Sequence, residues 1–481
     1  MPLYNEWRIK EVDKSIVARL STDNHIPFPI AILLAGRGIN TVTEAESFIS
    51  GKLGDLNDPF LFKEMRKAVE RIFFAKERNE KILIHGDYDV DGITSAVLLG
   101  RVLNDMGLYC EYYIPHRVEE GYGLSSTAVQ RCSHEGFSLL VSVDCGVTAE
   151  DVIIEATSRG IDVIITDHHE PGEKIPNCIA VIDPKISDCG YPFRELSGVG
   201  VSFKLAHALV KEGRNKSEQW AVDLDLREHL DLVALGTIAD MVPLKGENRI
   251  LARSGLEKLN NSSKPGVNAL KQKSGVKGTV DSIDVAFRLA PRINAAGRIG
   301  DAYEALRLLM ENDYIQAEQL ARKLDEHNKK RQEVESRVLE EALDQIERSG
   351  GVDVDPFVIV VYGATWPLGV LGIVSSRLTR KFNRPSLVIS GRGNICRGSA
   401  RSIESFHLCK ALKECSDLLL QYGGHAAAAG FELVKENISA FSERINIVAK
   451  KCLSDEDLVS YLDIDAELLN ENISIDFISR S

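Results

Sequence analysis

The sequence contains no apolar run that approaches the ~20 residues needed to span a bilayer. Its first residues, MPLYNEWRIKEVDK, contain no apolar segment of the kind found in secretory signals. The nine cysteines include no Cys-x-x-Cys pair, which argues against a zinc ribbon, and their odd number argues against a disulfide framework. Low-complexity tracts and internal repeats are also absent. These absences favour an ordinary globular protein of the cytoplasm, with reduced thiols and no membrane attachment.

Positive charge is in the minority. The chain carries 58 Lys and Arg against 71 Asp and Glu, a formal net charge of −13, which argues against a general coat for nucleic acid. Acidic residues, however, are missing from two arginine-rich segments. Residues 356–403 hold seven Lys and Arg and no Asp or Glu, and residues 285–300 hold three arginines and no acid. Such clusters neutralise backbone phosphates and position a strand without reading its bases.

The pattern of apolar residues changes along the 481-residue chain. Residues 1–75 show helical spacing and predict a helical lead-in. From Lys81, short continuous apolar runs alternate with amphipathic segments, as expected for a parallel sheet covered by helices on both faces. A charged, proline-free stretch at 311–349 predicts a long connector helix, and a second α/β pattern follows it. We therefore predict an α/β protein of two domains joined by a long helix, with a cleft between them.

Carboxylates and imidazoles follow three of the predicted strands at the point where each strand ends. The runs KILIHGDYDVDG, VSVDCG and VIITDHH carry, in order, His85 with Asp87, Asp89 and Asp91, then Asp144, then Asp167 with His168 and His169. The carboxyl ends of parallel strands meet at one edge of a sheet, and such sheets bind ligands beyond that edge. We therefore expect these side chains to converge.

The residue types in this group point to divalent metal ions. Mixed His and Asp ligands suit Mn²⁺ and other mid-series ions, whereas carboxylates alone would favour Mg²⁺ or Ca²⁺. There are enough ligands for two ions with a bridging carboxylate, and two ions ~3.5–4 Å apart stabilise both the attacking and the leaving oxygen in phosphoryl hydrolysis. Taken singly, a strand-end Asp is more often a helix cap or a turn residue. The coincidence on three successive strands favours the metal interpretation.

Motifs along the chain resemble those of a known family. HGDYDVDG, VDCG, TDHH and LGTIADMVPL are similar to the four motifs of the DHH phosphoesterase superfamily. PRINAAGR, RGSARS and YGGHAAAAG resemble motifs of the bacterial RecJ single-strand-specific exonucleases. The resemblance implies a DHH domain with the metal site at 76–310, a connector helix at 311–349 and a smaller DHH-associated substrate-binding domain at 350–450. It also implies that 451–481 begins an OB-fold domain that is missing here.

The resemblance assigns roles to individual residues. One metal ion would be held by His85, Asp89 and Asp144, and the other by Asp91, Asp144, His168 and Asp240. Asp144 would bridge the two ions, Asp87 would lie close by as an additional ligand, and His169 would face the scissile phosphate. The candidate catalytic residues are therefore His169, Asp144 and Asp87. The candidate contacts to nucleic acid, including a 5′-terminal phosphate, are Arg292, Arg298, Ser399, Arg401 and His425.

The activity implied is 5′→3′ hydrolysis of single-stranded DNA to mononucleotides, in DNA repair and recombination. The implied cofactor is a pair of Mn²⁺ ions, with Mg²⁺ as the alternative. The implied partners are single-stranded DNA and a helicase or single-strand-binding protein, and the implied state is a monomer. Two other functions fit less well: a DHH phosphodiesterase on short oligonucleotides or cyclic dinucleotides, and a non-catalytic replication factor that binds nucleic acid. One departure from the family is Pro367, which stands where a histidine is usual.

Overall fold

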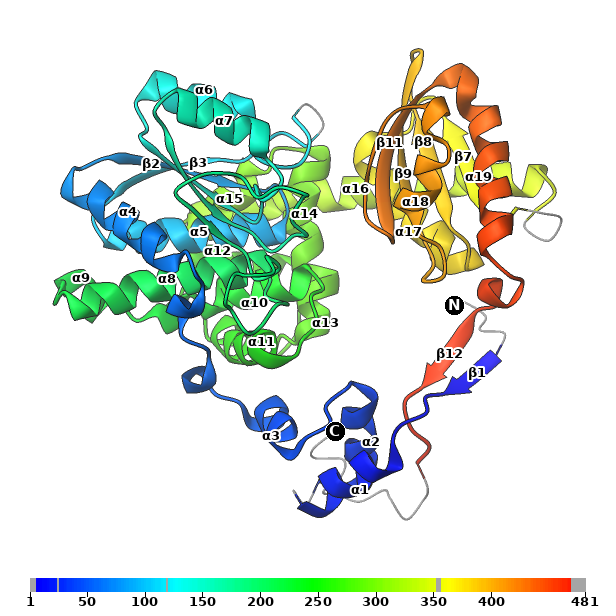
Figure 1. The fold of residues 1–481 in the computed structure, drawn as a ribbon. Helices are drawn as coiled ribbons and strands as arrows, with labels where there is room; N and C mark the ends of the chain where they lie inside the picture. Colours follow the sequence, from blue (N-terminus) through cyan, green and yellow to red (C-terminus); the bar gives the residue numbers. More distant parts are fainter. Residues whose placement is uncertain (1–5, 24–25, 118–119, 352–355, 469–481) are drawn as a thin grey trace. The chain divides into compact units, whose positions relative to one another are not determined.

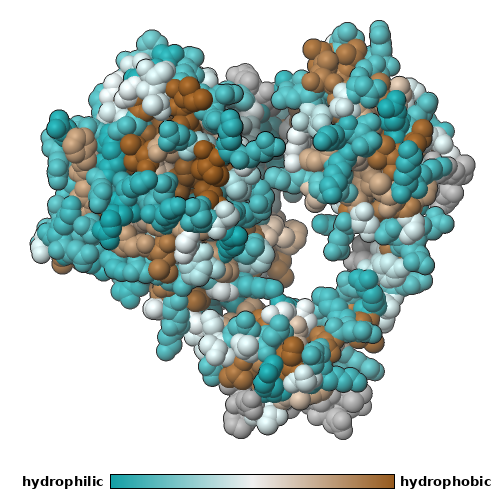
Figure 2. Space-filling model, in the orientation of Figure 1, coloured by the Kyte–Doolittle hydropathy of each residue, from teal (hydrophilic) through white to brown (hydrophobic). Residues whose placement is uncertain are grey.

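The computed structural model describes residues 6–23, 26–117, 120–351 and 356–468, and within these ranges the chain forms two compact units. The larger unit comprises residues 47–329, and the smaller comprises residues 1–46 together with 330–481. Figure 2 shows that hydrophilic residues cover most of the visible face of each unit. No helix in the described part of the chain is both long enough and apolar enough to cross a bilayer.

The larger unit is built on a parallel sheet, as predicted from the continuous apolar runs. Its five strands lie in the order β3-β2-β4-β5-β6, and every neighbouring pair is parallel. The strands are β2 (Lys81–Gly86), β3 (Tyr109–Tyr113), β4 (Leu139–Val143), β5 (Asp162–Thr166) and β6 (Ala180–Ile182). Nearly all residues of β2, β4, β5 and β6 are buried, because helices cover both faces of the sheet. The strand ends that carry the predicted ligands therefore share one edge.

Helices lie on both faces of this sheet (Figure 1). On one face, α4 (Met65–Glu77), α5 (Val90–Asp105) and α8 (Gly198–Asn215) contact the strands and one another. On the other face lie α6 (Ser126–Glu135) and α7 (Glu150–Ser158). The apolar α10 (Leu230–Ala239) is buried among α5, α8 and α11 (Gly246–Asn260). Asp240, which directly follows α10, therefore comes at the end of a helix that packs against α5 and α8.

The rest of the larger unit is helical. The segment that contains PRINAAGR starts with a π-helical turn, Val285–Leu289, and continues as α14 (Ala290–Ile299). Its remaining helices are α9 (Gln219–Asp223), α12 (Pro265–Lys273), α13 (Ser282–Asp284) and α15 (Tyr303–Met310). The predicted connector is a single helix of 35 residues, α16 (Tyr314–Arg348), which runs from the larger unit into the smaller. The absence of proline and internal glycine allows this length.

The smaller unit has a mixed five-stranded sheet in the order β10-β11-β9-β8-β7. β7 and β8 are parallel, and the other pairs are antiparallel. The strands are β7 (Ile359–Gly363), β8 (Ser386–Ser390), β9 (Ile395–Arg401), β10 (Leu419–Gly424) and β11 (Ala428–Val434). The helices are α17 (Leu368–Phe382), α18 (Leu408–Lys413) and α19 (Ile438–Cys452). Two α/β domains joined by a long helix, the predicted fold class, are thus observed.

The N-terminal segment is helical except for one strand. Helices α1 (Lys14–Asp23), α2 (Phe28–Gly36) and α3 (Val42–Ser50) follow a short strand, β1 (Glu6–Ile9). β1 pairs in parallel with β12 (Tyr461–Ile464), which follows α19. A four-residue strand whose partner lies so far along the chain has no local signal, and the helical lead-in prediction missed it. The domain boundaries stay predictions, and residues 469–481 of the predicted OB-fold start lie outside the described residues.

Candidate metal centre

The first motif folds as a strand, a tight loop and a helix start. His85 lies in β2, and Asp89 caps α5 by accepting hydrogen bonds at Oδ1 from the backbone amides of Asp91 (2.9 Å) and Gly92 (3.1 Å). Capping is the ordinary role of such an aspartate, but Oδ2 takes no part in these two bonds. Gly92 permits the tight loop, because a Cβ there would lie 2.5 Å from the backbone nitrogen of Asp87.

Asp91 is in the first turn of α5, and its carboxylate lies at the N-terminus of a second helix, α8. The amide of Gly198 donates to Asp91 Oδ2 (2.7 Å), and the amide of Val199 donates to Oδ1 (2.8 Å). The partial positive charge of the α8 N-terminus therefore stabilises this carboxylate. Two glycines make room for the acids: a Cβ on Gly236 would lie 2.7 Å from Asp91 Oδ1, and one on Gly198 would lie 2.2 Å from Asp144 Oδ1.

Asp144 follows β4 in an unusual backbone conformation. Its φ is +61°, in the left-handed region, and its amide donates to the carbonyl of Thr166 (2.8 Å). Gly146, two residues later, has φ +116°. A non-glycine residue with such backbone strain costs ~1–3 kcal/mol, and such residues cluster at functional sites. The strained conformation therefore indicates that this loop has a functional role in positioning the Asp144 side chain.

The first residue of the Asp-His-His motif organises the other two. Asp167 is buried, and its carboxylate accepts hydrogen bonds from the amides of Val147 (2.9 Å) and His168 (2.7 Å) and contacts His169 Nδ1 (2.7 Å). Burial alone would raise the pKa of Asp167, but the hydrogen bond and positive charge of His169 hold it below its usual value. Asp167 is thus a stable negative charge that orients the two histidines.

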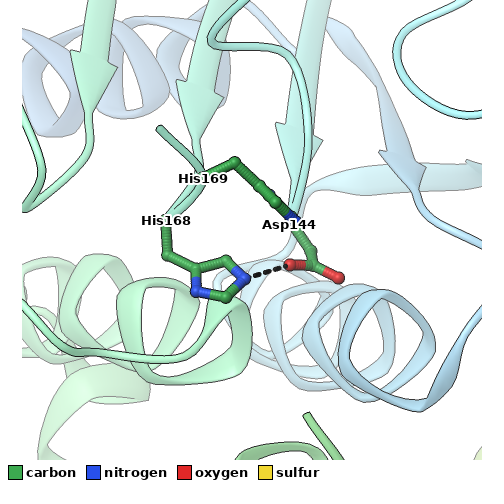
Figure 3. A group of neighbouring side chains, drawn as sticks. All are labelled: Asp144, His168 and His169. Atoms are coloured by element: carbon green, nitrogen blue, oxygen red, sulfur yellow. Dashed lines mark ion pairs between the residues drawn. The ribbon is translucent and has the colours of Figure 1, made fainter. Parts of the chain in front are cut away.

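The His168 ring faces three carboxylates. Nε2 lies 3.1 Å from Asp144 Oδ1, 3.7 Å from Asp240 Oδ2 and 3.9 Å from Asp91 Oδ2. Figure 3 shows the ring aimed at the Asp144 carboxylate, with the two residues at the ends of neighbouring strands. Burial lowers the pKa of His168 to about 3, with a further lowering from His169. The ring is therefore neutral at pH 7 and carries one N–H and one nitrogen lone pair.

Three overlapping groups of ligand atoms lie together, the atoms of each within 4.8 Å of one another. The groups are Asp144 with His168 and His169, Asp91 with His168 and Asp240, and Asp87 with Asp89 and Asp144. The structure thus brings together every predicted metal and catalytic residue except His85, which belongs to none of the three groups. Asp144 and His168 each belong to two of the three groups.

Charge in this group is unbalanced. Burial, followed by the charge of neighbouring aspartates, raises the pKa of Asp87, Asp91 and Asp144 well above the usual value. The same causes raise the pKa of Asp240 to about 7. Buried Asp87 Oδ1, Asp144 Oδ1 and His168 Nε2 have no hydrogen-bond partner within the described residues. Unpaired buried acceptors that converge are costly unless a cation is bound between them, so the donor set fits divalent metal ions.

His85 stands at the edge of this group. It is fully buried, and burial lowers its pKa to about 4. Its ring stacks on Tyr113, with centroids 5.4 Å apart, and its Nδ1 lies 3.5 Å from the sulfur of Cys145. Its Nε2 has no partner within the described residues. His85 therefore also offers a buried, unprotonated nitrogen.

Sequence reasoning missed Tyr122 and Asp183. The Tyr122 hydroxyl lies 2.9 Å from His169 Nδ1 and 3.5 Å from the carbonyl of Asp144. Burial lowers the pKa of His169, but Asp167, followed by Asp240 and Asp89, outweighs this effect and raises it to about 9. Asp183 follows β6, and burial raises its pKa to about 8. Asp183 directly follows β6, just as Asp144 directly follows β4. An aspartate at the end of an apolar run was therefore visible in the sequence at this position too.

The predicted nucleic-acid contacts divide between the units, with Arg292 and Arg298 on α14 in the larger one. Arg292 Nη2 lies 2.8 Å from Asp325 Oδ1, and its Nη1 donates to the carbonyl of Arg288 (2.6 Å). The arginine is thus fixed against α16. Arg298 is half-buried and lies near enough to Tyr88 to lower the pKa of its hydroxyl, against the larger opposing effect of burial.

Ser399 and Arg401 share strand β9 in the smaller unit. A Cβ on Gly372 in α17 would lie 3.1 Å from Ser399 Oγ and 3.2 Å from Arg401 Nη2, so both polar groups lie against the first turns of that helix. Arg401 pairs in register with Ala428 of β11, and the turn before Ala428 carries the exposed His425. These three predicted residues therefore lie at one end of the sheet. Pro367 immediately precedes α17 and fits its start.

The comparisons with known proteins agree with this geometry. Residues 81–237 match the model of the DHH family, N-terminal domain, and residues 355–451 match that of the DHHA1 domain. A single-stranded-DNA-specific exonuclease RecJ from Dickeya dadantii is 37% identical, with 97% of this chain and 82% of the relative covered. The chain belongs to the RecJ family.

Other members of the RecJ family are similar over nearly the whole chain. The RecJ of Bacillus subtilis is 42% identical over 98% of this chain, and the chain spans 59% of that relative's length. The crystal structure of RecJ from Thermus thermophilus in complex with Mn²⁺ matches with a TM-score of 0.82 at 32% identity, and covers 97% of this chain and 65% of that one. The chain thus spans about three fifths of these two RecJ proteins.

Proposed function

We propose that this RecJ-family chain is a metal-dependent nuclease that hydrolyses single-stranded DNA from its 5′ end to mononucleotides. The observation that carries the proposal is the convergence of unpaired, buried carboxylate and imidazole lone pairs at one edge of the larger sheet. Such an arrangement of unpaired acceptors is costly unless cations are bound between them. DNA as substrate implies action in repair and recombination in the cytoplasm.

The residues present fit two divalent ions, with Mn²⁺ favoured by the imidazoles and supported by the Mn²⁺ complex of the Thermus relative. Their proposed ligands are His85, Asp89 and Asp144 for one ion, and Asp91, Asp144, His168 and Asp240 for the other. When bound, such ions neutralise phosphate charge and make water acidic enough to serve as a nucleophile near neutral pH. Asp87 would be an additional ligand, since one of its carboxylate oxygens lies within 4.8 Å of ligand atoms of both Asp89 and Asp144.

His169 supplies a proton donor beside these carboxylates. In the metal-free protein its pKa of about 9 keeps the ring protonated at pH 7, and Asp167 and Tyr122 fix its orientation. An N–H group of this ring next to the proposed ions would donate a hydrogen bond to a phosphate oxygen and stabilise charge that develops there. Preorganised donors of this kind contribute about 10²–10³ in rate.

The smaller unit would bind the 5′-terminal phosphate. Ser399 and Arg401 lie against the first turns of α17, where backbone amides and the helix dipole favour an anion. His425 lies at the same end of this sheet. Arg292 and Arg298 would contact the backbone of the strand. These contacts explain polarity, because a terminal phosphate carries more charge than an internal phosphodiester.

A nuclease assay tests the proposal. Protein with Mn²⁺ is expected to release mononucleotides from a 5′-phosphorylated single strand of about 30 nucleotides, and to act much more slowly on dinucleotides and duplex. Asp144→Asn removes the proposed bridging charge and should abolish release. Asp151→Asn changes an exposed aspartate in the first turn of α7 and is the matched control, which should keep full activity. The proposal fails if EDTA or Asp144→Asn leaves the rate unchanged.

A further inference from the structure

We infer that Cys145 is a positioning residue for the metal centre: its sulfur accepts a hydrogen bond from Nδ1–H of His85 and leaves Nε2 as the nitrogen that faces the metal. The inference rests on the metal centre of the proposed function, and it adds a residue whose role none of the motifs assigns. The contact itself is direct, since Sγ lies 3.5 Å from Nδ1.

Burial limits the partners that the imidazole of His85 can have. The side chains of His85 and Cys145 are both fully buried, so water does not compete for Nδ1. Tyr113 covers the ring, with an interplanar angle of 21°, and restricts its rotation. Nε2 has no hydrogen-bond partner within the described residues. Among the described residues, Cys145 is therefore the side chain that hydrogen-bonds to the His85 ring.

The tautomer of His85 decides whether it can bind a metal ion. A neutral imidazole carries one N–H and one lone pair. If the thiol donated to Nδ1, the ring proton would sit on Nε2, and that nitrogen could not be a ligand. If Nδ1–H donates to the sulfur, Nε2 carries the lone pair. Metal-binding histidines usually donate their other N–H to a carboxylate, a carbonyl or water. Here the ring also interacts with the backbone carbonyl of His85 itself, and the thiol is the side chain that contacts Nδ1.

The loop conformation holds the thiol in this position. Cys145 lies between Asp144 (φ +61°) and Gly146 (φ +116°), and its carbonyl accepts a hydrogen bond from Ser142 Oγ (2.8 Å). A Cβ on Gly146 would lie 2.7 Å from that same hydroxyl, so glycine is required there. One strained turn thus orients both the Asp144 carboxylate and the Cys145 thiol. The simpler interpretation is that Cys145 only packs, as the fully buried Cys132 on α6 does.

Binding of Mn²⁺ alone separates these interpretations. Mn²⁺ is titrated into the wild-type protein and into Cys145→Ala, Cys145→Ser and Cys132→Ala. The six-line electron paramagnetic resonance signal measures the Mn²⁺ that remains free. Serine is included because its shorter side chain preserves polarity in the pocket but does not reach Nδ1 without movement. We expect two ions in wild type and in Cys132→Ala, and one of the two sites weakened about 10–100-fold in both Cys145 variants. Either Cys145 variant that folds suffices for the test.

The tautomer provides a second readout that packing alone would not change. Two-bond ¹H–¹⁵N spectra of histidine-labelled, metal-free protein, assigned with His85→Gln, should show His85 as the Nδ1–H form in wild type and a changed signal in the Cys145 variants. Unchanged Mn²⁺ binding in those variants, or an Nε2–H form in wild type, overturns the inference. Absence of Mn²⁺ binding by wild type would instead overturn the proposed metal centre.

Discussion

Neutralising one carboxylate of the metal centre should make the metal-free protein more stable while it removes activity. We consider Asp240→Asn, since burial, and then the charge of Asp89, raise the pKa of Asp240 to about 7. A raised folded-state pKa means that the folded protein favours the protonated acid. The protonated acid therefore contributes fully to the free energy of unfolding at low pH, and this contribution is lost as the pH rises through about 7.

The size of the effect follows from the same shift. The pKa of about 7 lies roughly three units above the usual 3.8, and each unit corresponds to about 1.36 kcal/mol. Ionised Asp240 therefore costs at most about 4 kcal/mol at pH 8, and less if a neighbouring acid takes up the proton instead. The larger unit should gain roughly 2–4 kcal/mol from Asp240→Asn, or about 4–8 °C in melting temperature.

Thermal unfolding at pH 8 in EDTA, and again with Mn²⁺, tests this reasoning. In EDTA the variant should melt higher than wild type, and its advantage should shrink towards pH 4 because both side chains are then uncharged. With Mn²⁺ the order should reverse, since wild type gains binding energy that the variant lacks. A variant that melts at or below the wild-type temperature in EDTA at pH 8 would refute the claim that burial and neighbouring charge make ionised Asp240 costly.

Three further changes test other parts of the proposed function. His169→Gln should lower the nuclease rate about 10²–10³-fold while Mn²⁺ binding stays within a few-fold of wild type; strong loss of Mn²⁺ would make His169 a ligand instead. Gly198→Ala places a Cβ 2.2 Å from Asp144 Oδ1 and should weaken Mn²⁺ binding more than tenfold in titrations. Gly54→Ala is the control for the loss of a glycine, because a Cβ there would meet nothing within 4 Å. Arg401→Ala should remove the preference for 5′-phosphorylated over 5′-hydroxyl strands in initial-rate assays, and an unchanged ratio would place the phosphate elsewhere.

Much of the fold could be predicted because its signals are local. The sheet of the larger unit follows from apolar runs that are buried on both faces, and α16 follows from a charged stretch without proline or internal glycine. The convergence of the candidate ligands could be predicted because the carboxyl ends of parallel strands share one edge, so placing Asp144 near His168 needed no knowledge of loop geometry.

The remaining features depend on contacts between distant segments. Tyr122 reaches His169 from 47 residues away, and β1 pairs with a strand more than 450 residues along the chain. Arg292, predicted as a phosphate contact, is fixed by Asp325 on a different helix. Asp167, part of the motif, accepts a hydrogen bond from the amide of Val147, 20 residues earlier in the chain. Such pairings are set by tertiary packing, which periodicity and motif spacing do not encode.

The most direct test of the central claim is anomalous X-ray diffraction from crystals grown with Mn²⁺. We expect two anomalous peaks at the carboxyl edge of the larger sheet, with Asp144 between them, His85 Nε2 on one and His168 Nε2 on the other. No peak at this edge, or a single ion that Asp144 does not contact, would contradict the two-metal centre.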